Sequence, residues 1–239
     1  MKQQHMLRYI ISILCLVLFS VTLSAQNDSI PKDSIAFKNK YGIRVGADLS
    51  KLARTFLDDD YSGFEIQGDY RITRDLYVAG ELGTEEKTTI TEYLNSTSKG
   101  NYIKAGIDYN LYQNWYGMDN LIYSGLRVGF STFSQTLSQY TIYDINNSAW
   151  GQNTIIDPKD FDGLTAIWAE LIFGLKVQTL NNLYLGVNVQ LKRRITETEP
   201  DNFENIYIPG FGRTYDSGSF GIGFGYNISY LIPLYKKGK

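Results

Sequence analysis

Apolar and polar residues alternate with a period of two along most of the chain from residue 41 onward. In the clearest segment Phe64, Ile66 and Tyr70 fall on one face, while Glu65 and Asp69 fall on the other. A helix would scatter the charges around its circumference, so this pattern predicts an extended strand. Similar segments predict eight strands, at residues 41–50, 64–72, 76–85, 103–111, 122–131, 167–178, 183–194 and 220–230.

The connections between these segments alternate in length. Three are short, lying around Thr73-Arg74, at residues 113–119 and at Asn181-Asn182. The others are long, at residues 51–62, 84–99, 135–162 and 196–217. Outer-membrane barrels combine short periplasmic turns with long extracellular loops. We therefore expect an all-β, antiparallel, up-and-down transmembrane β-barrel of about eight strands, with its long loops extracellular and its termini periplasmic.

The polar faces of the predicted strands carry balanced charge. Seven basic and seven acidic residues lie on these faces: Arg44, Asp48, Glu65, Asp69, Arg71, Glu81, Glu85, Lys104, Asp108, Arg127, Glu170, Lys176, Lys192 and Arg194. Pairing across a narrow lumen explains this balance, whereas a soluble lipocalin-like barrel, with these faces in water, would not need it. The apolar faces are therefore expected to contact lipid.

Aromatic residues gather toward the short-turn end of the apolar faces. They are Tyr41, Tyr70, Tyr109, Tyr112, Trp115 and Tyr116. Tyrosine and tryptophan are enriched where a membrane meets water, because their rings are apolar and their tips polar. This cluster predicts an interfacial girdle.

Two interpretations of the charged lumen remain open at this point. The charges could line a narrow passive channel, or they could fill the barrel as a salt-bridged plug. A barrel of about eight strands has an interior just wide enough for side chains to fill it. Because an unpaired ion in such an interior is costly, we favour the plug.

The first 25 residues have the features of a cleavable signal peptide. Lys2 and Arg8 are basic, residues 10–21 form a short apolar run, and Ala25 is a small residue suited to cleavage. We expect residues 26–40 to form a flexible periplasmic lead-in, residues 41–235 the barrel and residues 236–239 a basic tail.

Cleavage after residue 25 would leave a chain without histidine or cysteine, because His5 and Cys15 lie in the removed segment. Cys15 follows Ile13 and Leu14 rather than the small residues of a lipobox, so lipidation is disfavoured. The net charge would change from −2 to −4 with the loss of Lys2 and Arg8. An acidic chain gives no reason to expect nucleic-acid binding.

Few residues are candidates for chemistry. Without histidine, the triad mechanisms and histidine-ligated zinc are excluded. Glu81, Glu85 or Lys104 could in principle react with perturbed pKa values, but structural ion pairing is the simpler explanation. The run Asp58-Asp59-Asp60 is a weak candidate for a calcium-like cation and is more typical of a solvated loop. We expect no enzyme activity, no cofactor and no metal.

Several sequence stretches resemble known barrels. They are the ending at residues 225–235, the run Asp58-Asp59-Asp60-Tyr61, and residues 129–134 and 206–211. The chain resembles small outer-membrane barrels of the OmpA and PorT kind, and in particular an uncharacterised family of Bacteroidota. The resemblance implies an outer-membrane location and recognition of the last strand by the insertion machinery, although Tyr235 is followed by four further residues where such barrels end on an aromatic residue.

Together these patterns predict a non-enzymatic barrel with a structural or interaction role in the cell envelope. The expected partners are outer-membrane lipid and lipopolysaccharide, the insertion machinery and an unidentified envelope protein. A narrow passive channel and a soluble lipocalin-like binder are the alternatives.

Overall fold

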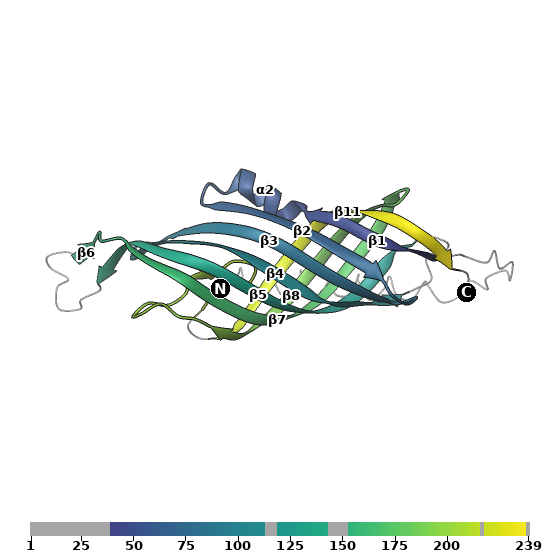
Figure 1. The fold of residues 1–239 in the computed structure, drawn as a ribbon. Coiled ribbons are helices and arrows are strands. Elements are labelled where there is room, and N and C mark those ends of the chain that lie inside the picture. Colours follow the sequence, from purple (N-terminus) through teal and green to yellow (C-terminus); the bar gives the residue numbers. More distant parts are fainter. Residues whose placement is uncertain (1–38, 113–118, 143–152, 216–217, 238–239) are drawn as a thin grey trace, which may run out of the picture. The chain divides into compact units, whose positions relative to one another are not determined.

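The computed structural model describes residues 39–112, 119–142, 153–215 and 218–237. Within them, eight antiparallel strands form a closed ring (Figure 1). In chain order they are β1 (Asn39–Asp48), β2 (Tyr61–Arg71), β3 (Leu76–Ile90), β4 (Leu94–Tyr112), β5 (Leu121–Ile142), β7 (Lys159–Leu180), β8 (Leu183–Glu197) and β11 (Phe220–Lys237). Each strand pairs with the next, and β11 closes the ring on β1. The prediction of an all-β, up-and-down barrel is confirmed.

The remaining elements are small. The helix α2 (Leu49–Leu57) follows β1, and the short strand β6 (Asn153–Ile155) pairs with the end of β5. A hairpin of β9 (Tyr207–Ile208) and β10 (Gly212–Arg213) lies between β8 and β11. Among the described residues no helix is long and apolar enough to cross a membrane.

The connections sort by length between two ends of the barrel. At the turn end, β2 joins β3 and β7 joins β8 through a few residues. Asn182 adopts a φ of 63° there, which asparagine tolerates in a tight turn. The loop end carries α2, the β3–β4 hairpin, the β5–β7 connection and the β9–β10 hairpin.

The described parts of two predicted long loops are largely strand, which corrects the expectation for residues 84–99 and for 135–142 and 153–162. The strands β3 and β4 stay paired from Leu76 through Ile90, and β5 continues to Ile142. In this extension polar side chains face each other, as in the 2.9 Å contact between the hydroxyls of Thr88 and Thr97. The apolar alternation ends before the hydrogen-bonded ladder does, so the pattern underestimates strand length.

The first predicted loop, at residues 51–62, is also corrected, because α2 occupies most of it. Asp48 ends β1 and caps the helix, its carboxylate accepting from the backbone N–H of Ser50 at 2.6 Å and of Lys51 at 3.3 Å. Leu49, which lies within the predicted first strand at residues 41–50, is the first residue of this helix. The chain therefore leaves the barrel wall at Asp48.

Both ends of the barrel extend slightly beyond the expected bounds of residues 41–235. Asn39 pairs with Lys237 and Lys40 with Lys236, so part of the predicted basic tail is strand. The predicted signal peptide and most of the lead-in lie outside the described residues.

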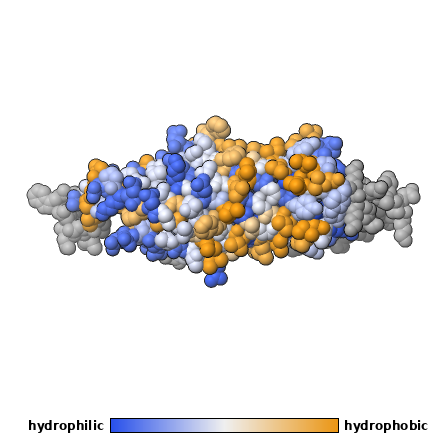
Figure 2. Space-filling model, viewed as in Figure 1, coloured by the Kyte–Doolittle hydropathy of each residue, from blue (hydrophilic) through white to orange (hydrophobic). Residues whose placement is uncertain are grey.

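The outward-facing side chains form an apolar band around the barrel. The following members are 37–59% exposed: Ile43, Val45, Phe64, Ile66, Val78, Leu82, Ile103, Ile107, Leu126, Val128, Phe130, Ile167, Phe173, Val187, Val189, Leu191, Tyr230 and Ile232. On the face seen in Figure 2, hydrophobic residues cluster over this part of the barrel, and hydrophilic residues dominate toward β6.

The band has a defined edge toward the loop end. Thr84, Asn101, Thr132 and Thr165 are neighbours across β3, β4, β5 and β7. Each is the next outward position beyond an apolar one, such as Leu82 before Thr84. A row of polar residues therefore borders the apolar band on these four strands.

The predicted aromatic girdle is only partly described. Tyr70, Tyr109 and Tyr112 are exposed near the turn end, whereas Trp115 and Tyr116 lie outside the described residues. Tyr41 is 7% exposed and is not an outward-facing residue. A register shift after Tyr41 turns its ring, which stacks on Tyr235 with ring centres 5.1 Å apart.

Candidate functional site

The predicted polar-face charges lie inside the barrel. All but Arg194 are buried: Arg44, Asp48, Glu65, Asp69, Arg71, Glu81, Glu85, Lys104, Asp108, Arg127, Glu170, Lys176 and Lys192. Arg194 is half-buried near the loop end and pairs with Glu197 at 2.9 Å. Period-two alternation places these side chains on the inner face of their strands.

The centre of the lumen is organised around Lys104. Its ammonium lies 2.6 Å from a carboxylate oxygen of Glu81, 3.3 Å from Glu65 and 3.9 Å from Glu170. These residues come from β2, β3, β4 and β7, so one cation joins four strands. Because the lysine is fully buried, its charge depends on the three carboxylates.

Ion pairs continue from Lys104 toward the turn end. In order, the residues are Glu81, Arg127, Asp108, Lys176, Asp69 and Arg44. Arg127 and Lys176 each have an acid oxygen 2.7 Å away. The cavity between these side chains measures about 10 Å³, which holds about one water molecule. We call Lys104, Glu65, Glu170 and this chain of ion pairs the charge layer.

Tyrosines on the inner faces of the strands complete the packing of the charge layer. The sequence-based prediction named only charged residues and did not include them. The guanidinium of Arg44 lies 4.5 Å from the ring centre of Tyr184 and 5.6 Å from that of Tyr77. The ammonium of Lys176 lies 4.8 Å from the ring of Tyr123. Each tyrosine lies an even number of residues from a predicted charge on the same strand, so the period of two could have identified it.

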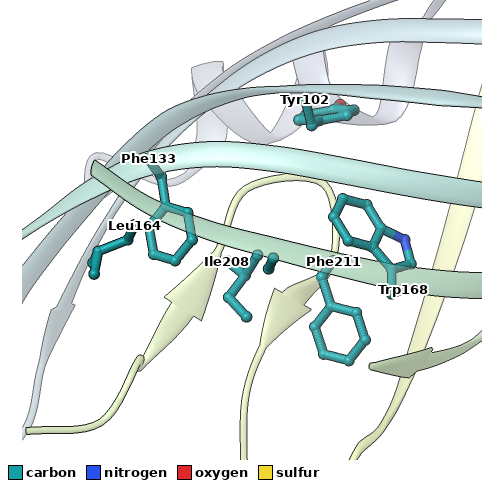
Figure 3. Packing of buried hydrophobic residues seen from close by; sticks show 7 residues of the cluster. Tyr102, Phe133, Leu164, Trp168, Ile208 and Phe211 are labelled. Carbon is teal, nitrogen blue, oxygen red and sulfur yellow. The ribbon is translucent and has the colours of Figure 1, made fainter. Parts of the chain in front are cut away.

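A connecting loop fills the lumen at the loop end. Residues 203–214, which we call the loop plug, place Ile208 and Phe211 inside the barrel (Figure 3). Both pack against strand residues, namely Tyr102, Phe133, Leu164, Ala166 and Trp168. Trp168 meets Phe211 edge-on with ring centres 6.1 Å apart. These residues belong to the predicted long loop at residues 196–217, and their place inside the barrel corrects that prediction.

Polar contacts hold the backbone of the loop plug. The hydroxyl of Tyr207 and the N–H of Gly210 both donate to Oε2 of Glu85, at 2.8 and 2.9 Å. Lys192 donates to the carbonyl of Gly210 at 2.7 Å. Gly210 has a φ of 82°, and a Cβ there would lie 2.5 Å from the ring of Tyr102, so glycine is required. Burial, reinforced by the nearby Glu85 carboxylate, raises the pKa of Tyr207 well above its ordinary value.

The helix α2 adds a cation that the sequence analysis missed. The ammonium of Lys51 contacts Glu85 directly and lies 3.7 Å from Glu65. Burial disfavours its charge, but the carboxylates of Glu85 and Glu65 outweigh that effect and raise the pKa of Lys51. Glu85 thus joins α2, β3 and the loop plug.

The first residue of the acidic run in the β1–β2 connection, Asp58, is paired with bases. Asp58 lies 3.0 Å from the ammonium of Lys87 and 3.2 Å from Arg54. The hydrogen bond from Lys87 is the main cause that lowers the pKa of Asp58. Among the described residues, no three acid, histidine or cysteine side chains are grouped so that they could hold a metal ion.

A family model described as a domain of unknown function, DUF6048, matches residues 6–237. The chain belongs to this family. No curated protein matches the chain. Among solved structures, the chain is similar to Ail, the attachment invasion locus protein of Yersinia pestis, with 10% identity and a TM-score of 0.39 over 81% of this chain and 98% of that one.

Two features occupy the lumen of the DUF6048 barrel within the described residues. The charge layer fills its middle with side chains from the strands. The loop plug inserts a hairpin at its loop end.

Proposed function

We propose that this DUF6048 chain is a non-enzymatic outer-membrane barrel with a structural or interaction role in the cell envelope. In this proposal residues 1–25 direct export and are removed, the turn end and the termini are periplasmic, and the loop end is extracellular. The barrel is inserted by the envelope's insertion machinery, and its loops bind lipopolysaccharide and an envelope protein.

The inverted distribution of side chains supports membrane insertion most strongly. The apolar band faces outward, and the buried interior carries the charges. A soluble lipocalin-like barrel needs the reverse, with an apolar interior and a polar exterior. Outer-membrane barrels have an apolar exterior and a polar interior. The same arrangement therefore argues against the soluble alternative.

The filled lumen supports a structural role over a passive channel. Ion pairs cross the barrel from Arg44 to Lys104, and the loop plug covers their loop-end side. A conducting lumen would need a continuous polar path, and the cavity within the charge layer has room for about one water molecule.

Two measurements test this proposal. Fractionation and gel migration with and without heating should place the protein in the outer membrane as a heat-modifiable barrel. Purified protein in planar bilayers should give no steady conductance. A soluble periplasmic protein would refute membrane insertion, and a steady single-channel current would refute the closed lumen.

Orientation is testable with single cysteines, because the segment after residue 25 contains none. Glu92 lies at the loop end, between β3 and β4, and Arg74 lies at the turn end; both are exposed. A membrane-impermeant maleimide should label Glu92→Cys on intact cells. The same reagent should label Arg74→Cys only after the cells are permeabilised. The opposite labelling pattern would reverse the orientation.

A further inference from the structure

The barrel wall is interrupted beside α2. Pairing between β1 and β11 stops at Asp48 and Asn227, whereas β11 continues to pair with β8 as far as Phe220. Among the described residues, the stretch 220–226 of β11 therefore has no strand on its β1 side. Residues 61–65 of β2 lack a β1 partner in the same way.

The helix α2 covers one edge of this interruption. It contacts both β2 and β11. On the β2 side, the hydroxyl of Thr55 accepts from the N–H of Gly63 at 2.9 Å and lies 3.2 Å from its carbonyl oxygen. Thr55 thus replaces the missing strand partner of Gly63. On the β11 side, the described residues provide no such replacement.

A cleft of about 870 Å³ occupies the uncovered side. This volume is within the range of small-molecule sites, about 300–1,000 Å³. Its mouth includes Leu57, Ile222 and Phe224, which are 86%, 79% and 78% exposed. The values for Ile222 and Phe224 exceed those of the apolar band because no neighbouring strand covers these side chains on the β1 side.

The mouth lies at the loop-end edge of the apolar band. Ile222 pairs with Leu191 and Phe224 with Val189, both members of the band. Phe220 pairs with Arg193, a charged residue at the edge of the band. The cleft therefore opens toward lipid if the barrel is inserted as proposed above.

The inner lining of the cleft is cationic. Its bases are Lys51, Arg54, Lys87, Lys104, Lys192 and Arg213. Its only acids are Asp48, whose carboxylate caps α2, and Glu85, which binds Lys51 and the loop plug. Arg213 is exposed and has no acidic partner among the described residues. The other bases already have acidic partners: Arg54 and Lys87 pair with Asp58, Lys51 with Glu85, and Lys104 and Lys192 with Glu170. Arg213 is therefore the base that favours an anionic group at the cleft.

Glycine keeps the floor of the cleft open. Gly223 lies between the outward-facing Ile222 and Phe224 and lines the cleft. A Cβ at this position would lie 2.8 Å from Oε1 of Gln190 and 3.0 Å from Cε of Lys192. The absence of a side chain lets Lys192 lie flat beside β11.

We propose that this lateral cleft binds one acyl-chain phospholipid of net negative charge from the surrounding leaflet. The acyl chain lies across Ile222 and Phe224 beneath α2, and the phosphate contacts Arg213 at the cationic rim. The apolar mouth and Arg213 together fit such an amphiphile, whereas a free phosphate or a lipid without net charge would use only one of these two features. This inference rests on membrane insertion but not on the closed lumen.

Native mass spectrometry of the folded, detergent-solubilised barrel tests the proposal with phosphatidylglycerol and phosphatidylcholine as probes. We expect one phosphatidylglycerol to be retained with about tenfold preference over phosphatidylcholine. Ala53→Trp fills the cleft from α2 and should abolish retention, whereas Ala105→Trp, on the outer face of β4, should not. Arg213→Ser should reduce the preference for phosphatidylglycerol, unlike Arg74→Ser at the turn end.

Equal retention of both lipids, or equal loss in the two tryptophan variants, would overturn the proposal. Competition by glycerol phosphate at the same concentration would show that the headgroup alone binds, and would overturn the acyl-chain assignment. Loss of heat-modifiable migration in every preparation would instead refute the proposed membrane insertion on which this inference rests.

A second measurement needs no variant. Phosphatidylglycerol with a diazirine on its acyl chain should crosslink wild-type protein mainly to residues 49–57 and 220–226. Crosslinks spread evenly around the apolar band would mean that the barrel has no lateral lipid site, even if the protein is correctly inserted.

Discussion

The charge layer and the loop plug fill the same lumen by different means. The charge layer consists of strand side chains whose positions follow from alternation, such as Lys104 among Glu65, Glu81 and Glu170. The loop plug is an inserted hairpin that packs Phe211 against Trp168. The first cannot leave without unfolding the wall, whereas the second could detach while the barrel stays closed.

This difference predicts two kinds of failure. Removing a buried charge leaves its partners unpaired in an interior that cannot rearrange, so the whole barrel should lose stability. Removing an apolar contact of the loop plug should release the loop first, since local opening costs less than global unfolding.

The largest effect is expected from Lys104→Leu. The substitution leaves Glu65, Glu81 and Glu170 without their shared cation, and should lower the free energy of unfolding by roughly 3–5 kcal/mol. Urea unfolding in lipid vesicles measures this loss of stability. In the same strand, Lys99→Leu removes an exposed pair with Glu86, and should cost less than about 1 kcal/mol. Equal losses would mean that the charge layer is no more important than surface charge.

Phe211→Ala should act locally. Deleting a buried phenylalanine costs about 3 kcal/mol, and here that cost should appear as release of the loop plug. Ile208 is fully buried, so maleimide should label Ile208→Cys slowly in the parent and much faster when Phe211→Ala is added. Phe130→Ala, on the outer face, is the control. Unchanged labelling would show that the hairpin does not depend on this contact.

The sequence predicts the charge layer well because a strand has only two faces. Once Glu65 and Asp69 are placed opposite Ile66, the period of two fixes the inner face of β2. Across the barrel, Lys176 then meets Asp69 although the two are 107 positions apart. The pairing partners themselves need the ring register, which alternation alone does not determine.

The loop plug and α2 could not be placed from the sequence in the same way. Residues 206–211 are apolar and lie in a long connection, but nothing local indicates that they turn inward. The helix could have been recognised, since Asp48 is a good N-cap and Leu49, Ala53 and Phe56 have helical spacing. The predicted strand, which continued to residue 50, concealed this signal.

Tyr102→Phe tests whether the two regions are coupled. The ring of Tyr102 packs in the cluster with Phe211, and its hydroxyl donates to Glu65 at 2.6 Å. Losing a hydrogen bond to a charged group should cost about 1.5 kcal/mol in urea unfolding. Tyr102→Phe should also increase maleimide labelling of Ile208→Cys. Tyr109→Phe, exposed on the same strand, should change neither; a global loss without faster labelling would mean that the regions are independent.

The smallest effect is expected from alkaline pH and involves the loop plug alone. Because the pKa of Tyr207 is raised on folding, its contribution to docking is complete below the unfolded value of about 10 and is lost as pH rises through the folded value. Trp168 fluorescence, in a background with Trp115→Phe and Trp150→Phe, should stay constant from pH 7 to about 10 and change above it. In Tyr207→Phe this alkaline change should be weaker, since the phenol that ionises against Glu85 is gone. A transition of equal size in both proteins would mean that Tyr207 does not cause the alkaline change.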